Sequence, residues 1–247
     1  MIRRALVLLL APVICACAAG VPTPASTAPP ARVLPPLVYV AVGASETFGT
    51  GTQQPGRDAF PQQLLGRFSA SHDLTLYNLG IPSETTAAAL TDELPVAAGL
   101  HADLATVFFN VDDLVAGVPA ADFGQRLDGI VAALSAGGRT RVAIASTPPI
   151  DELPAAAACE RGSPRCPLQG VRIPPLSEVR SLVAAYNAAI QRVASAHGAV
   201  VVDLAGAGLT VSQHPEYLSS DGFHPSTLGA GALAEAFYQA LTAPRSA

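Results

Sequence analysis

The sequence contains no lysine and no tryptophan: all 14 basic residues are arginine, and aromatic residues make up 5% of the 247 positions. The absence of lysine excludes enzymes that form a Schiff base, Ser-Lys hydrolases, nucleotide-binding proteins with a phosphate-loop lysine and dehydrogenases with a Tyr-x-x-x-Lys pair. The small share of aromatic side chains disfavours a broad stacking platform for sugars or bases.

Charge is scarce as well, because only 13% of the residues are charged and the net charge at pH 7 is −5. An acidic chain of this kind has no attraction for a phosphate backbone, so we expect no nucleic acid partner. Half of the residues are hydrophobic, which excludes a disordered chain. The length suffices for one α/β domain with a sizeable core, and we expect this domain to be a monomer.

Residues 1–18 have the pattern of an export signal. Arg3 and Arg4 form a basic start, and the apolar run over 5–14 is too short to span a bilayer as a helix. Two ends of the signal remain open: A-C-A fits an ordinary cleavage site, whereas I-C-A-C resembles a bacterial lipobox that makes Cys17 the lipidated first residue. We favour the lipobox. The protein is therefore expected to be exported, as a cell-envelope lipoprotein or secreted, with membrane contact only through such an anchor.

Residues 19–36 are rich in proline, alanine and threonine and lack periodicity, which indicates an extended tether before a domain over 37–247. This domain holds two cysteines, Cys159 and Cys166. In an exported protein we expect them to form a disulfide that closes a short loop. Neither a second cysteine pair nor a spaced histidine pair accompanies them, so no metal site is predicted.

Apolar runs and amphipathic segments alternate along the domain. The runs predict strands over 37–42, 74–79, 105–109, 141–146 and 199–204. The other segments predict helices over 61–70, 84–98, 121–136, 177–196 and 228–241. This order indicates an α/β fold, with a parallel sheet of about five strands in a three-layer sandwich. A long insertion over 147–175, in which no helix or strand is predicted, is expected to wall the mouth of a site.

Ligands of open parallel sheets bind beyond the carboxyl ends of the strands. Several candidate site residues are expected at this edge: Ser45 after the first strand, Gly80 after the second, Asn110 and Asp112 after the third, and Asp221 and His224 before the last helix. Their convergence predicts a single site.

Three of these residues are the types that acyl transfer from an ester needs, namely a nucleophile (Ser45), a base (His224) and an orienting acid (Asp221). Asp221 precedes His224 by three positions, close enough for its carboxylate to accept the imidazole N–H. Simpler interpretations are a helix N-cap serine, a turn-capping aspartate and a surface histidine. The run G-A-S also occurs in dehydrogenases, but Gly49 and Gly51 are misplaced for a dinucleotide site.

Four stretches, in order, resemble sequence blocks of the SGNH/GDSL hydrolase family. G-A-S-E-T-F-G is similar to the first block, N-L-G-I-P-S-E-T to the second, A-D-L-A-T-V-F-F-N-V-D-D-L to the third and S-S-D-G-F-H-P-S to the fifth. The resemblance implies a flavodoxin-like fold, no cofactor, and hydrolysis of a small-molecule ester or acylated substrate through an acyl-enzyme. It makes Ser45 the nucleophile, His224 the base and Asp221 the orienting acid. The N–H groups of Ser45 and Gly80 are implied to hold the oxyanion, with a third-block asparagine.

Two positions depart from the family pattern. Ala44 replaces the first-block aspartate, which neither attacks nor transfers a proton. Asp112 stands where the third block has asparagine, and an ionised carboxylate cannot donate a hydrogen bond to an oxyanion. Asn110, two residues earlier, projects to the same side of an extended strand but about 6–7 Å away. The expected function is a serine esterase, and the alternative is an envelope binding module that retains the fold.

Overall fold

The computed structural model describes residues 34–164, 166–168 and 173–244. The predicted export signal, Cys17 and most of the tether lie outside the described residues. Within the described part of the chain, no helix is both long enough and apolar enough to span a membrane.

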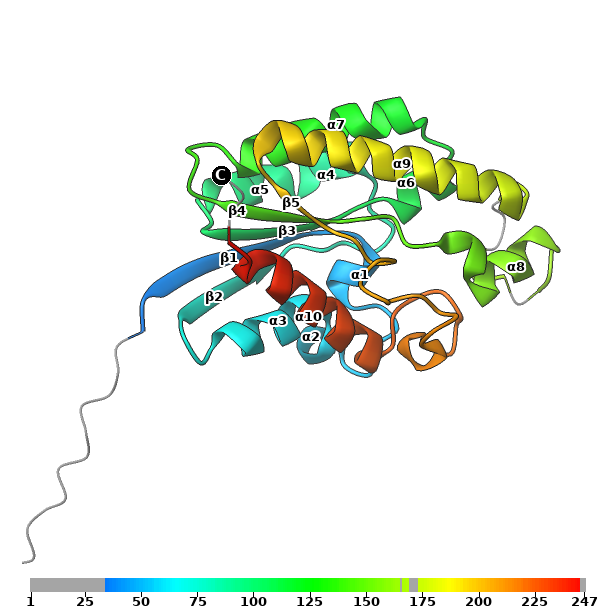
Figure 1. Cartoon of the computed structure of the whole chain (residues 1–247), viewed down its shortest axis with the longest axis horizontal. Coiled ribbons are helices and arrows are strands. Elements are labelled where there is room, and N and C mark those ends of the chain that lie inside the picture. Colours follow the sequence, from blue (N-terminus) through cyan, green and yellow to red (C-terminus); the bar gives the residue numbers. More distant parts are fainter. Residues whose placement is uncertain (1–33, 165, 169–172, 245–247) are drawn as a thin grey trace, which may run out of the picture. The chain divides into compact units, whose positions relative to one another are not determined.

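A five-stranded parallel sheet forms the centre of the domain (Figure 1). The strands are β1 (Pro36–Gly43), β2 (Asp73–Asn78), β3 (Leu104–Phe108), β4 (Arg141–Ala145) and β5 (Val200–Val202). Each overlaps the range predicted from its apolar run. The central strand β3 is buried along its whole length, as expected for a sheet that is covered on both faces. The predicted α/β fold is therefore confirmed.

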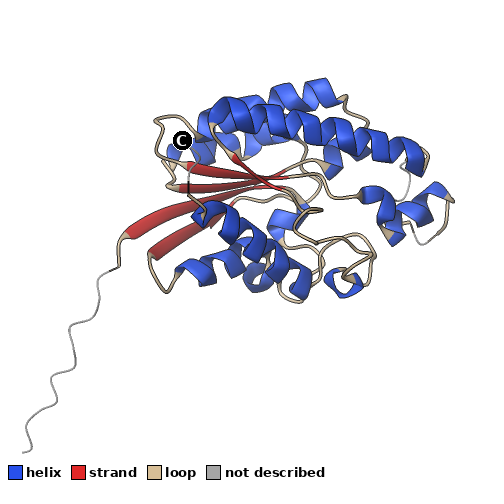
Figure 2. Cartoon of the chain, in the orientation of Figure 1, coloured by secondary structure: helices blue, strands red, loops and turns tan. Residues whose placement is uncertain are grey.

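Helices cover both faces of this sheet (Figure 2). One face carries α4 (Thr86–Asp92), α5 (Leu94–Gly99), α7 (Ala120–Leu134) and α9 (Leu176–His197), and the other carries α3 (Phe60–Phe68) and α10 (Thr227–Thr242). The connections hold the short helices α1 (Ser45–Phe48), α2 (Pro55–Asp58), α6 (Val111–Val115) and α8 (Pro154–Glu160) and the 3₁₀ turns η1 (Ile150–Glu152) and η2 (Pro215–Tyr217).

A stacked aromatic pair lies between the main helices of each layer. Phe123 of α7 and Tyr186 of α9 have ring centroids 4.3 Å apart, and Phe60 of α3 and Phe237 of α10 are 4.8 Å apart. All four residues are fully buried. Large aromatic side chains contribute much of the apolar area that stabilises a core of this kind.

Two predictions about the helices are wrong. Residues 84–98 form α4 and α5 instead of one helix, because Pro95 lacks the backbone N–H that would continue the first helix, and a new helix begins at Leu94. The insertion over 147–175 is not free of secondary structure, since it contains η1 and α8. The predicted disulfide between Cys159 and Cys166 is confirmed, with the two Cα atoms 4.6 Å apart.

The order of the strands, β2-β1-β3-β4-β5, places the ends of β1 and β3 side by side. Gly43, the last residue of β1, pairs with Phe108, the last residue of β3. The connection after β1 leads to α3 on one face, and the connection after β3 leads to α7 on the other face (Figure 1). In open α/β sheets with this flavodoxin-like order, ligands bind where the connections diverge in this way.

Candidate active site

Ser45 lies at the point where the connections diverge. It is the first residue of α1 and follows the end of β1 by two positions. Gly43 permits the sharp turn before it, because φ is +152° and an added Cβ would lie 2.6 Å from the Phe108 carbonyl oxygen. The Ala44 N–H donates to the same carbonyl oxygen at 3.2 Å. These contacts hold Ser45 at the carboxyl edge of the sheet, where it is 5% exposed.

Asp221 and His224 form a hydrogen-bonded pair, with Asp221 Oδ2 and His224 Nδ1 2.7 Å apart. Asp221 Oδ1 accepts three further hydrogen bonds, from the Ser219 hydroxyl (2.7 Å) and from the N–H groups of Phe223 (2.8 Å) and His224 (3.0 Å). Burial acts to raise the pKa of Asp221, but the hydrogen bonds from Ser219, His224 and Phe223 outweigh it and lower the pKa to about 2. The carboxylate is therefore ionised at neutral pH and can orient the imidazole.

The segment that follows α1 packs against the segment that carries His224. Gly51 has a φ of +90°, and an added Cβ there would lie 2.7 Å from His224 Cβ. The Gln53 N–H donates to Thr227 Oγ1 at 3.0 Å, which joins the same two segments a little further along. Ser45 and His224 thus come from opposite ends of the domain and lie on adjoining segments.

The Ser45 hydroxyl donates to Oε2 of Glu46 at 3.2 Å, rather than to His224. Glu46 is 8% exposed. Burial raises the pKa of Glu46, while its own backbone N–H, the charge of a protonated His224 and the Ser45 hydroxyl act in the opposite direction. Glu46 is not among the residues predicted from the sequence. The available signal was an acidic residue directly after the candidate nucleophile, in a stretch that is otherwise buried.

The candidate oxyanion donors differ in what they already bind. The Gly80 N–H donates to Asn78 Oδ1 at 3.1 Å, so it is engaged within the second block. Asn110 is 1% exposed, and in the part of the chain that the structure describes neither Nδ2 nor Oδ1 of its side chain has a hydrogen-bond partner. Buried amides without a partner are rare in folded proteins. The Asn110 side chain therefore has donors available for a ligand.

Asp112 lies in the first turn of α6 and is partly buried. Burial, followed by the negative charges of Glu46 and Asp113, raises the pKa of Asp112 to about 7. Near neutral pH a substantial fraction of Asp112 is therefore protonated and can donate a hydrogen bond.

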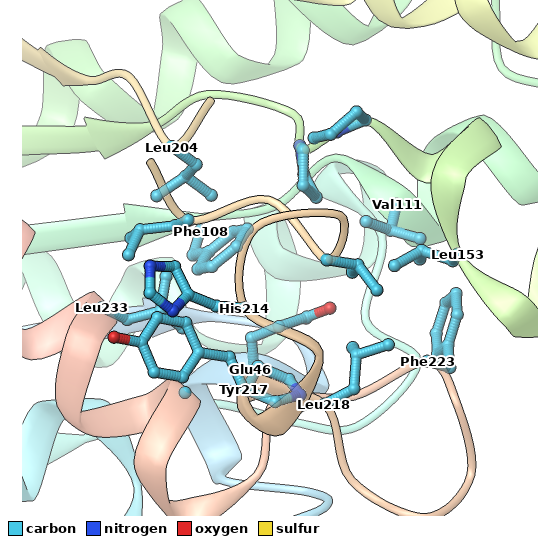
Figure 3. A pocket seen from close by; sticks show the side chains of 16 residues that line it. Glu46, Phe108, Val111, Leu153, Leu204, His214, Tyr217, Leu218, Phe223 and Leu233 are labelled. Atoms are coloured by element: carbon cyan, nitrogen blue, oxygen red, sulfur yellow. The ribbon is translucent and has the colours of Figure 1, made fainter. Parts of the chain in front are cut away.

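A mostly apolar pocket of about 80 Å³ begins at Glu46, whose side chain projects into it (Figure 3). Its walls come from the end of β3, the insertion and the segment between β5 and α10, and include Phe108, Pro149, Leu153, Leu204, Leu218 and Phe223. The insertion thus walls a cavity at this edge, as predicted. Ser45 itself lies beside the lining. Among the residues that the structure describes, no three His, Cys, Asp or Glu side chains are grouped so as to hold a metal ion.

The sequence profile of one known family, described as GDSL-like Lipase/Acylhydrolase, matches residues 41–232. The match includes the end of β1, both oxyanion candidates that follow β3, and the paired Asp221 and His224. The chain belongs to the GDSL-like lipase/acylhydrolase family. The family resemblance of the sequence blocks is thereby confirmed. No curated protein matches the chain.

Solved structures share the fold at low sequence identity. LAE5, an alpha/beta hydrolase enzyme from the metagenome of Lake Arreo in Spain, is 20% identical; the match covers 84% of this chain and 96% of LAE5, with a TM-score of 0.63. The esterase EstA from Pseudoalteromonas sp. is 16% identical over 83% of this chain and 96% of its own, with a TM-score of 0.59. A mutant of Axe2, an acetyl-xylooligosaccharide esterase from Geobacillus stearothermophilus, is 17% identical. The match covers 87% of this chain and 99% of Axe2, with a TM-score of 0.61. At these identities the likeness establishes the fold.

Proposed function

We propose that this member of the GDSL family hydrolyses carboxylic esters through an acyl-enzyme on Ser45. The observation that carries the proposal is the paired Asp221 and His224, held against the segment that begins at Ser45 by the close approach of Gly51. An apolar pocket begins at the residue next to Ser45, which provides room for a substrate.

The proposed steps use these three side chains in the roles of a serine hydrolase triad. His224 Nδ1–H donates to Asp221, which leaves Nε2 free to accept a proton. As Ser45 Oγ bonds to the ester carbonyl carbon, its O–H bond breaks and the proton passes to Nε2. The intermediate collapses, the alcohol leaves with that proton, and Ser45 retains the acyl group. Water then attacks the acyl-enzyme in the same way and releases the acid.

The oxyanion is proposed to be held by the backbone N–H of Ser45 and by a side chain beyond the end of β3. The unpartnered Asn110 amide and the protonated form of Asp112 are the two candidates for that side chain. Gly80 contributes only when its N–H turns away from Asn78. Preorganised donors of this kind usually supply the largest single part of the rate enhancement.

The pocket favours a substrate with an uncharged acyl group. Its walls are mostly apolar, and each buried methylene contributes about 0.8 kcal/mol. The carboxylate of Glu46, when ionised, disfavours anionic groups near the scissile bond. EstA and Axe2 are named as esterases, the second for acetylated xylooligosaccharides, and this supports an ester as the substrate class here.

A second candidate function is a binding module with weak or no hydrolysis. It is favoured by one observation, the aspartate at position 112, where the family pattern has an asparagine. A carboxylate that is ionised during the reaction repels the oxyanion instead of binding it. Turnover of a simple ester distinguishes the two functions.

The test is hydrolysis of p-nitrophenyl acetate and butyrate by the purified protein. Ser45→Ala and His224→Ala should each lower kcat by several orders of magnitude, since members of a triad act as a unit. A fluorophosphonate probe should label the wild type and not Ser45→Ala. The matched control is Ser69→Ala, at an exposed position after α3, which should leave turnover unchanged. Full activity in Ser45→Ala contradicts the mechanism, and a wild type with neither turnover nor labelling supports the binding module.

A further inference from the structure

Glu46 is the part of the site that the ester mechanism above leaves unused. Its carboxylate accepts the Ser45 hydroxyl at 3.2 Å and the residue is 8% exposed. Among the described residues, no ion pair joins it to an arginine. A buried carboxylate is costly unless hydrogen bonds and a positive charge compensate it.

His224 is the group that can supply this charge. The segment that follows Glu46 adjoins His224, because an added Cβ at Gly51 would lie 2.7 Å from His224 Cβ, and the charge of a protonated His224 acts to lower the pKa of Glu46. Asp221 occupies Nδ1 of the imidazole at 2.7 Å, so the proton received from Ser45 is carried on Nε2. Asp221 thus binds His224 directly, while the carboxylate of Glu46 binds the candidate nucleophile on the adjoining segment.

We propose that Glu46 is a further catalytic residue, which holds the Ser45 hydroxyl in the resting enzyme and stabilises the His224 imidazolium while Ser45 attacks. This inference rests on the proposed esterase function. In that step the Oγ–H bond breaks, the Oγ–C bond forms, the imidazole gains one positive charge and the carbonyl oxygen gains one negative charge. Glu46 and Asp221 keep their charges throughout and attract the imidazolium more strongly than the neutral ring.

Other titratable groups face Glu46 and enter the design of the test. Asp112, on α6, carries like charge, and its pKa is raised by burial and by Glu46. His214 lines the same pocket from the segment between β5 and α10, and its Nδ1 lies 2.9 Å from Oε1 of Glu216. Protonation of Asp112 changes the charge near Glu46, so the pH dependence is measured with and without Asp112.

The experiment compares Glu46→Gln, Glu46→Asp and the wild type with p-nitrophenyl butyrate over the pH range. Glu46→Gln keeps the shape and removes the charge, and we expect it to lower kcat by about 10- to 100-fold at pH 8. The difference in kcat between the wild type and Glu46→Gln should become smaller as pH falls, because the Glu46 carboxylate of the wild type also becomes neutral. Glu46→Asp keeps the charge and should retain most of the rate. Glu178→Gln, at an exposed position on α9, is the matched control.

The same comparison in an Asp112→Asn background shows whether the pH dependence of kcat comes from Glu46. Thermal unfolding of each variant shows whether a lower rate reflects slower catalysis or a smaller amount of folded protein. Turnover that depends on Ser45, with Glu46→Gln as fast as the wild type at every pH, overturns this inference and leaves the esterase function standing. A wild type without Ser45-dependent turnover overturns both. The inference is supported if kcat of Glu46→Gln is lower than that of the wild type and if this difference grows as pH rises.

Discussion

At the scale of single residues, Asp112 is one of the two side chains proposed to hold the oxyanion. Burial and the charge of Glu46 raise its pKa to about 7, so it is a neutral donor below that pH and a repelling carboxylate above it. If it is the donor, wild-type activity falls as pH rises through about 7. Asp112→Asn should then raise kcat at pH 8 by roughly 10-fold or more and remove this alkaline limb. The measurement is a pH–rate profile of both proteins.

Asn110 is the alternative oxyanion donor, and it predicts a different pH–rate profile. If its unpartnered amide holds the oxyanion, Asn110→Ala should lower kcat by about 100-fold or more, and Asp112→Asn should change little. Asp122→Asn, at an exposed position on α7, controls for the loss of a charge. An Asp112→Asn variant that is slower than the wild type at every pH would falsify the match between Asp112 and the family asparagine.

The sequence predicted the pairing of Asp221 with His224, but not the contact between Ser45 and Glu46. Asp221 and His224 are three positions apart, so their pairing depends on local chain geometry that the sequence contains. The contact between Ser45 and Glu46 depends on the burial of both, which is set by packing against distant segments. The Gly80 N–H donates to the side chain of Asn78, whose rotamer cannot be read from sequence.

At the scale of elements, the five strands were predictable because each is a short run of buried apolar residues between amphipathic segments. The helices α1, α2 and α6 were not predicted, since four or five residues are too few to show a helical period. Pro95 was a visible signal, and its disruption of the helical ladder is the reason that α4 and α5 are separate.

The insertion is held by a disulfide within it and by hydrogen bonds and an ion pair to neighbouring segments. The Cys159–Cys166 disulfide closes a loop with a sequence separation of 7. The Ala155 N–H of α8 donates to the Gly222 carbonyl at 3.1 Å, next to the segment of His224. The double variant Cys159→Ala/Cys166→Ala should lose at most about 2–3 kcal/mol of unfolding free energy, because a short loop gains little from closure. KM for the butyrate ester should rise, since Leu153 in the pocket wall is held less firmly.

Denaturant unfolding and steady-state kinetics measure these two effects. Reduced wild-type protein is the control, and it should match the double variant in both. A double variant with unchanged stability would show that packing of α8 alone holds the insertion in place.

At the scale of the whole molecule, we propose that the chain is exported and held to a membrane through a lipid on Cys17, with residues 19–36 as the spacer. Cys17→Ser should then move the protein from the membrane fraction to the soluble fraction, while Cys15→Ser should not. Fractionation and mass spectrometry of the mature N-terminus measure this. A soluble wild type that begins at Ala19 would indicate ordinary signal cleavage instead.

The placement of Ser45 and His224 at opposite ends of the domain has a consequence for protein synthesis. A growing chain exposes Ser45 early, yet His224, the proposed base, arrives only with the segment before α10. Contacts between such distant segments form slowly and late in folding. If Ser45 and His224 act as proposed, an incomplete copy holds a serine without a partner to take its proton, and it cannot attack the esters of the cell that is making it.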